Sequence, residues 1–198
     1  MRHSLRFVIA PVAAVALLLS ACGSDSSEST SAPASESTGE FNDADVIFAQ
    51  SMIPHHEQAV EMAEFALAPA AGASAEVQAL ATQIQGAQDP EIELMTGWLE
   101  GWGQPLEMPG MEDMDDMAGM EGMDGMMSAE DMTNLAGLTG AEFDTAWATM
   151  MIAHHEGAIA QAETVKAAGS NSDVLLLADQ IIAAQQAEID EMTALLAG

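Results

Sequence analysis

Four segments of the chain carry apolar residues at alternating steps of three and four, the spacing of one buried helix face. They are residues 43–68, 74–102, 140–168 and 170–197, and their filling is rich in alanine, a strong helix former. No useful length of sequence alternates apolar and polar residues with the period of two that a half-buried strand requires. Gly72 and Gly169 mark the turn within each pair of segments. We therefore predict an all-α protein.

The second half of the chain repeats the first. The phrase MIPHHE at residues 52–57 recurs as MIAHHE at residues 151–156. In the following helix of each pair, eight positions match at a constant offset of 97: Leu80, Gln83, Ile84, Gln88, Glu91, Ile92, Met95 and Leu99 with Leu177, Gln180, Ile181, Gln185, Glu188, Ile189, Met192 and Leu196. A lone helical hairpin cannot bury its apolar face, so two copies predict a four-helix bundle.

The N-terminal residues are typical of an exported protein. Arg2 and Arg6 precede a short apolar run, residues 7–19, which suits a signal peptide better than a membrane-spanning helix. The sequence Leu-Ser-Ala-Cys that ends at Cys22 resembles a bacterial lipobox, in which the chain is cut before the cysteine and the thiol is lipidated. The alternative is an ordinary cleaved signal with a stray cysteine. Cys22 is the single cysteine, which excludes an intrachain disulfide.

These features predict three parts. Residues 1–21 are a lipoprotein signal peptide, and residues 22–40 are a flexible tether without apolar residues to bury. Residues 41–198 form one four-helix domain, with a methionine-rich acidic loop at about residues 103–139. We expect an extracytoplasmic protein, at the cell surface or in the periplasm, whose lipid anchor is its only membrane attachment.

Charge excludes one class of partner. Beyond the leader, a single basic residue, Lys166, stands against thirty-two Asp and Glu residues. Such a chain repels nucleic acids and anionic lipid headgroups, and it accumulates cations. A merely soluble acidic coat would have the same composition, so charge alone does not identify the partner.

The chemistry is concentrated in the repeated phrase. Outside the leader the chain has four histidines, and all of them lie in the two phrases. The helical stripe that contains Met52 also contains His55, and the stripe of Met151 contains His154, so both histidines should face the bundle core. His56 and His155 sit about 100° round the helix, one turn from the same methionines. The alternative for each is a core histidine satisfied by a hydrogen bond, but four histidines in two matched phrases favour a metal site.

Copper suits this ligand chemistry best. Di-iron bundles carry Glu-x-x-His, whereas this chain carries Met-x-x-His at the same spacing. Thioether sulfur favours soft Cu(I), and imidazole suits copper, zinc and iron alike. We therefore predict a site for Cu(I) rather than Cu(II), open also to Ag(I), with zinc and iron less favoured. Gln88 and Gln185 lie centrally in apolar stripes, where they either orient a histidine through its second ring nitrogen or bond to each other or to water.

A second candidate site is the methionine-rich loop. From residue 108 to residue 126 a methionine falls at every third position, with acidic residues and glycines between. Steps of three circle a helix instead of forming a stripe, so this is a poor core helix. The array could supply thioethers to Cu(I) or Ag(I), act as a low-complexity linker, or consume oxidants as methionine sulfoxide. Its supplementary metal ligands would be Met108, Met111, Met114, Met117, Met120, Met123, Met126 and Met127.

The phrases MIPHHEQAVEMA and MIAHHEGAIAQAE, with Gln-x-x-Glu-Ile-x-x-Met in the helices that follow, resemble the bacterial "domain of unknown function 305" family, which includes CopM-like copper-binding proteins. The likeness covers about residues 41–197 and implies a four-helix bundle of ferritin-like appearance. It also implies copper binding through six ligands: Met52, His55, His56, Met151, His154 and His155. Gln161 stands where the first repeat has Met62, which weakens the expectation that both sites bind equally.

The sequence thus predicts a membrane-tethered protein that sequesters copper, confers tolerance or hands copper to an exchange partner. A hydrolase is disfavoured, because no nucleophile constellation, phosphate loop or acid–base pair is present in the sequence. Two alternatives stay open: a ferritin-like metal redox protein, and a structural lipoprotein whose histidines only satisfy the core.

Overall fold

The structure, a computed structural model, describes residues 39–108 and 125–198. Helices α1 (Asp43–Leu67) and α2 (Ala75–Trp102) form the first hairpin, and α4 (Gly140–Ala168) and α5 (Ser172–Ala197) form the second. A short helix, α3 (Ala129–Ala136), precedes α4. The described residues contain no strand, so the predicted all-α class is confirmed. The signal peptide and most of the tether lie outside the described residues and stay predictions.

The predicted loop at residues 103–139 needs a correction, because its last part is the helix α3. Ser128 caps this helix by accepting a hydrogen bond from the backbone of Asp131, whose side chain accepts in return from the Ser128 backbone. That reciprocal pair is a capping box, which satisfies two otherwise unpaired amides. The helix buries only Met132 and Leu135, too few residues to give a periodic signal in the sequence.

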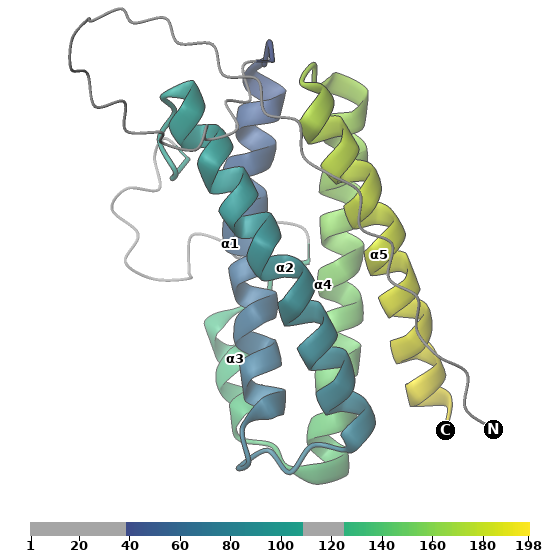
Figure 1. Cartoon of the computed structure of the whole chain (residues 1–198). Coiled ribbons are helices and arrows are strands. Elements are labelled where there is room, and N and C mark those ends of the chain that lie inside the picture. The colour runs from purple at the N-terminus through teal and green to yellow at the C-terminus, as the bar shows by residue number, and fades with distance from the viewer. Residues whose placement is uncertain (1–38, 109–124) are drawn as a thin grey trace, which may run out of the picture. The chain divides into compact units, whose positions relative to one another are not determined.

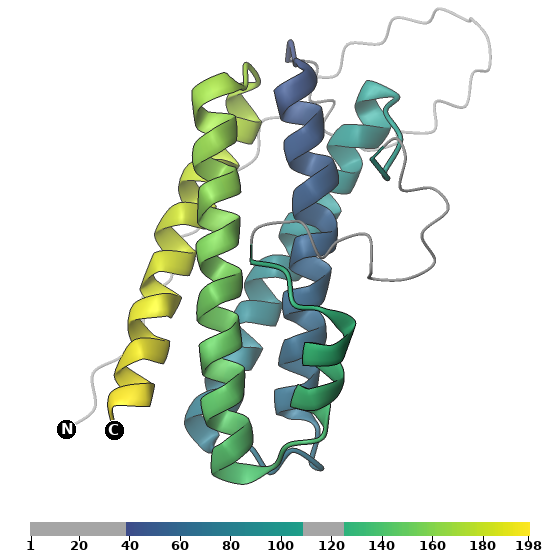
Figure 2. The ribbon, with the colours of Figure 1, turned by 180° about the vertical axis from the view of Figure 1, so that it is seen from behind.

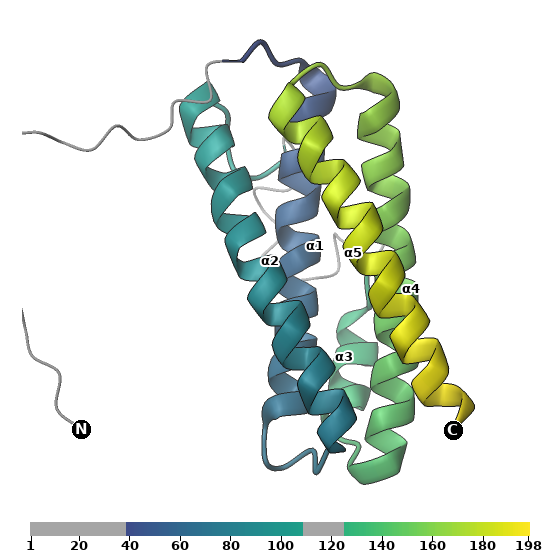
Figure 3. The same cartoon turned by 45° about the vertical axis from the view of Figure 1, so that its right-hand side comes forward.

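The four long helices form two layers. Close packing joins α1 to α2, α4 to α5, and α1 to α4 across the two hairpins. In Figure 1, α2 and α5 lie in front of α1 and α4, and the view turned by 45° shows the same order (Figure 3). From behind, α1 and α4 lie side by side, and α3 lies against them (Figure 2). The two helices that carry the histidine phrases are therefore direct neighbours.

Two equivalent sets of hydrogen bonds join the start of each phrase-bearing helix to the turn of the other hairpin. The buried carboxylate of Asp45, at the start of α1, accepts hydrogen bonds from the backbone amides of Ser170 and Asn171 in the α4–α5 turn. Asp144, at the start of α4, accepts one from the backbone amide of Ser74 in the α1–α2 turn, at 3.1 Å. The start of each phrase-bearing helix thus meets the end of the other. Hence α1 and α4 are antiparallel, and the two hairpins are related by an approximate two-fold axis.

The α4–α5 turn has no room for a side chain at residue 169. A Cβ placed on Gly169 would lie 2.5 Å from the Asp45 carboxylate and 2.8 Å from the carbonyl oxygen of Val165. A contact this short forces the neighbouring backbone to move. Gly169 is therefore required so that α4 can end against α1.

The core consists of two apolar clusters with the histidines between them. One cluster includes Met62 of α1 and Met151 of α4, and the other includes Met52 of α1 and Ala158 of α4. The predicted stripes that contain His55 and His154 are buried, except that Gln161 is only partly covered, whereas Leu196 on α5 is exposed. Among the described helices, none combines the length and the apolarity that crossing a bilayer demands.

Candidate metal centre

All four histidines of the two phrases are fully buried. His55 and His56 stand on α1, and His154 and His155 on α4. Because α1 and α4 are antiparallel neighbours, the two phrases run in opposite directions past each other. Four imidazoles in a core of aliphatic and thioether side chains are unusual, since burial of a polar group is unfavourable unless a partner compensates it.

The two phrases meet at His55 and His154. Their ring centroids lie 3.8 Å apart, with 43° between the ring planes. The ring of His155 lies 6.4 Å from that of His154. Burial lowers the pKa of His154 well below its ordinary value, and the nearby His55, His155 and His56 imidazoles lower this pKa further when they are charged. His154 is therefore neutral at neutral pH, which is the form that binds a metal ion.

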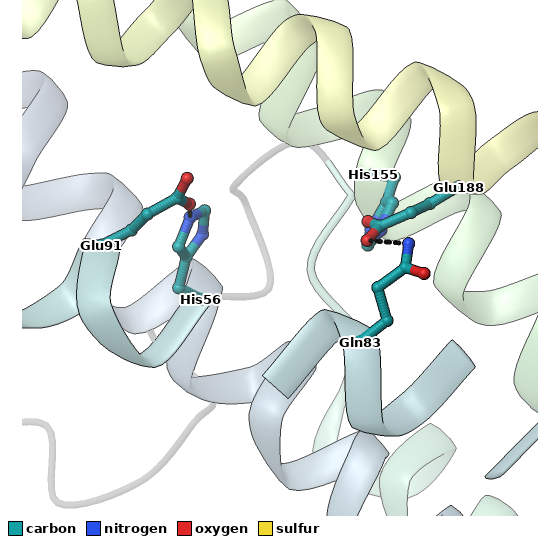
Figure 4. Close-up of polar contacts among 5 residues, drawn as sticks. All are labelled: His56, Gln83, Glu91, His155 and Glu188. Carbon is teal, nitrogen blue, oxygen red and sulfur yellow. Dashed lines mark hydrogen bonds and ion pairs between the residues drawn. The ribbon is translucent and has the colours of Figure 1, made fainter. Parts of the chain in front are cut away.

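The second histidine of each phrase, His56 or His155, is called the outer histidine. Each outer histidine contacts a carboxylate of the neighbouring helix. The Nε2 atom of His56 lies 2.7 Å from an oxygen of Glu91 on α2, and that of His155 lies 2.8 Å from an oxygen of Glu188 on α5. Figure 4 shows each carboxylate lying against its ring. A carboxylate only accepts hydrogen bonds, so both contacts favour the tautomer in which Nε2 carries the proton.

The second ring nitrogen of each outer histidine has no such partner. The Nδ1 atoms of His56 and His155 are buried and make no hydrogen bond to any described residue. A buried, unpaired polar atom costs about 1–3 kcal/mol, so each case requires an explanation. A metal ion fits this geometry, because ligating histidines regularly donate their other N–H to a carboxylate.

The two carboxylates are not equally enclosed. The Glu188 side chain is 5% exposed and also accepts a hydrogen bond from Gln83 of α2, at 3.2 Å (Figure 4). The Glu91 side chain is 20% exposed. Gln83 belongs to the first hairpin and Glu188 to the second, so this hydrogen bond links the two hairpins beside His155.

The contacts to His56 and His155 come from residues that the sequence analysis did not assign to this task. Gln88 and Gln185 are buried as expected, but the Gln88 amide and the Gln185 carbonyl oxygen have no hydrogen-bond partner among the described residues. Glu91 and Glu188, three residues further along each helix, make the contact to His56 and His155 instead. The missed signal is that both glutamates belong to the repeat at offset 97. A role of the two glutamines toward His55 or His154 stays a prediction.

The methionines of the phrases lie in the same buried layer. Met52 and Met151 are fully buried, whereas Glu57 and Glu156 are exposed. Within residues 39–108 and 125–198, no three His, Cys, Asp or Glu side chains are placed to hold one metal ion together. A metal site built on these imidazoles therefore needs ligands of another type, and Met52 and Met151 supply thioether sulfur within one turn of them.

Hydrogen bonds hold the residues at the two ends of the methionine-rich segment next to the phrase on α1. Gln50 donates a hydrogen bond to the carbonyl oxygen of Pro105, at 2.8 Å. Gln58 accepts one from the backbone amide of Met127 and donates one to its carbonyl oxygen, at 2.7 and 2.9 Å. These two glutamines flank residues 52–57, so Pro105 and Met127 are held on either side of that phrase.

The returning end also touches the second phrase. Gly125 has φ +85°, and a Cβ there would lie within 3 Å of the backbone of Ala153, His154 and Gly157. Residues 125–127 therefore pass from the phrase on α4 to Gln58 on α1. Of the predicted supplementary ligands, Met108, Met126 and Met127 are half-buried here. Met111, Met114, Met117, Met120 and Met123 lie outside the described residues.

Comparison with protein families places the chain in a known family. The profile described as "Domain of unknown function (DUF305)" matches residues 45–196, which spans both hairpins and both histidine phrases. No curated protein matches the chain.

Solved structures of similar sequence share the fold. A Streptomyces coelicolor DUF305 protein, described as a candidate secreted protein, has 31% identity and a TM-score of 0.69, and the match covers 78% of this chain and 92% of that one. A Deinococcus radiodurans DUF305 fragment has 29% identity and a TM-score of 0.68, over 79% and 97% of the two chains. CopM in its Cu(II)-bound form has 32% identity and a TM-score of 0.64, over 77% and 95%. CopM structures with Cu(I) and with silver also match.

Proposed function

Because the chain belongs to the DUF305 family, whose profile spans both hairpins, we propose that it is an extracytoplasmic lipoprotein that binds copper. Its ligands are Met52, His55, His56, Met151, His154 and His155, with the methionine-rich segment as a supplementary source of thioethers. It sequesters copper, confers tolerance or passes the ion to an exchange partner.

One observation carries this proposal. Two Met-x-x-His-His phrases from different hairpins bury four imidazoles around the contact between His55 and His154. Histidines that merely filled the core would have both ring nitrogens paired, whereas Nδ1 of His56 and of His155 is buried and unpaired. The contact between His55 and His154 brings the two phrases together in the core, so we infer that the ligands of both phrases lie in one buried layer.

The ligand chemistry favours Cu(I). Thioether sulfur is a soft donor, and a site of sulfur and imidazole without thiolate suits Cu(I) and Ag(I). CopM, which resembles this chain over most of its length, has structures described as bound to Cu(I), Cu(II) and silver. These descriptions support copper as the ion, and the preference for Cu(I) rests on the methionines.

The location follows from the sequence of the N-terminus. The Leu-Ser-Ala-Cys sequence that ends at Cys22 supports lipidation, and the similar Streptomyces coelicolor protein is described as a candidate secreted protein. A bacterial protein outside the cytoplasm meets copper before the ion enters the cell. Mass spectrometry of the membrane fraction checks this, because lipidation adds diacylglycerol to Cys22 and a Cys22→Ser variant lacks it.

Titration with Cu(I) under reducing conditions, against a chelator that competes for the ion, tests the binding. We expect the protein to bind Cu(I) and a variant with all four histidines replaced by glutamine to bind far more weakly. Met132→Leu in α3 is the matched control, because it changes a buried methionine outside the phrases. A further variant lacks both the four histidines and the loop methionines. If it binds Cu(I) as tightly as the unchanged protein does, the proposal is refuted.

A parallel titration with Fe(II) distinguishes the ferritin-like alternative from the proposed copper binding. A metal redox protein would use the carboxylates of Glu91 and Glu188 as metal ligands, since iron prefers hard oxygen donors. Tighter binding of Fe(II) than of Cu(I), abolished by Glu91→Gln and Glu188→Gln, would favour that function.

A further inference from the structure

Two carboxylates that the sequence did not single out determine which nitrogen of the outer histidines is available. Glu91 contacts Nε2 of His56, and Glu188 contacts Nε2 of His155, so the same arrangement occurs twice about the approximate two-fold axis. All four side chains come from different helices. The repeat therefore preserves a carboxylate–imidazole pair and not only a histidine.

A neutral imidazole has one N–H and one lone pair, and its partner decides where each lies. A carboxylate has no proton to donate at neutral pH, so a glutamate at 2.7–2.8 Å from Nε2 fixes the proton on Nε2. The lone pair then lies on Nδ1, which is the buried atom without a hydrogen-bond partner in both residues. A glutamine at the same place would not impose this choice, because its amide both donates and accepts.

We propose that Glu91 and Glu188 are positioning residues that hold His56 and His155 as Nε2–H tautomers and so leave the Nδ1 lone pair of each ring available to a metal ion. The metal part rests on the proposed function, whereas the tautomer is a property of the metal-free protein. The pair at Glu188 is the more strongly held, because Gln83 donates a second hydrogen bond to that carboxylate.

Long-range ¹H–¹⁵N spectra of the metal-free protein at about pH 8, where an ordinary imidazole is neutral, measure the tautomers directly. We expect a protonated Nε2 and an unprotonated Nδ1 for His56 and His155. Glu91→Leu and Glu188→Leu should each give a tautomer mixture at the partner histidine alone, and Glu91→Gln and Glu188→Gln should restore Nε2–H only in part. Glu93→Leu, at an exposed position of α2, is the matched control and should change neither ring.

Titration with Ag(I), a diamagnetic probe with a spin-½ nucleus, tests the metal assignment. We expect ¹⁵N–¹⁰⁹Ag coupling at Nδ1 of both rings. The leucine variants should lose about 10- to 100-fold in Ag(I) affinity, whereas Glu93→Leu should lose none.

Protonation of Nδ1 in the metal-free protein, or silver coupling at Nε2, overturns the inference. Absence of any Ag(I) or Cu(I) binding, with the Nε2–H tautomers observed, refutes instead the proposed function and the metal assignment while the carboxylate role stands. The two failures therefore give different spectra.

Discussion

At the scale of single residues, complete burial governs the behaviour of the histidines. His154 has no exposed surface, and burial together with its imidazole neighbours holds its pKa well below the ordinary value. In the unfolded chain the same residue titrates near 6.5. The folded state thus excludes a proton that the unfolded state binds.

This difference predicts a loss of stability on acidification. As the pH falls below about 6.5, the unfolded chain binds a proton at His154 and the folded protein does not, so the free energy of unfolding of the metal-free protein decreases. Urea unfolding at about pH 8 and pH 5.5 measures it. In His154→Gln that part of the decrease should vanish, and an identical pH dependence of the two proteins would contradict the prediction.

The sequence predicted which histidines face the core but not what holds them. The three- and four-residue steps place His55 and His154 on the apolar stripes, and both are fully buried. Helical periodicity describes one helix at a time, however, and the contact to His56 comes from another helix. Gln88 and Glu91 lie one turn apart on α2, so only the relative height of α1 and α2 decides which of them reaches the ring.

At the scale of elements, the four long helices begin and end within two residues of their predicted limits. Their apolar steps, glycines and capping residues agree with one another, which makes such limits readable in a sequence. The helix α3 was missed because eight residues give too little periodicity. Its one readable signal was the capping box of Ser128 and Asp131.

The reciprocal contacts between hairpins yield a stability prediction. Asp45→Ala removes a fully buried carboxylate and leaves the amides of Ser170 and Asn171 without their acceptor. We expect the free energy of unfolding to fall by about 2–4 kcal/mol, because a buried and a partly buried amide lose a charged partner. Chemical denaturation followed by circular dichroism measures the change.

Asp43→Ala is the matched control, since Asp43 lies in the same first turn but is exposed. It should cost less than about 1 kcal/mol, the value of a favourable charge at a helix N-terminus. Equal losses in the two variants would show that negative charge in the first turn of α1, and not the hydrogen bonds of Asp45, accounts for its role.

At the scale of the whole molecule, charge opposes folding. One basic residue beyond the leader faces thirty-two acidic ones, and their mutual repulsion is greater in the compact state than in the unfolded chain. Salt screens this repulsion over about 10 Å at 0.1 M. The protein should therefore be more stable at higher ionic strength.

We expect the melting temperature of the metal-free protein to rise by about 3–6 °C between low salt and about 0.3 M NaCl, which corresponds to about 1–2 kcal/mol for a chain of this size. Scanning calorimetry measures the rise. Tetramethylammonium chloride should give a similar increase, because screening does not depend on the identity of the cation. An increase with sodium alone would indicate specific cation binding instead.

The antiparallel crossing of α1 and α4 bears on the origin of the protein. An interface related by a two-fold axis is self-complementary, and His55 and His154 lie where that axis passes. A single hairpin with one phrase could therefore have assembled the same centre as a homodimer before duplication joined two copies in one chain. After fusion the halves were free to diverge. Gln83 donates a hydrogen bond to Glu188, and the described residues show no equivalent bond to Glu91, so the two halves already differ at this contact.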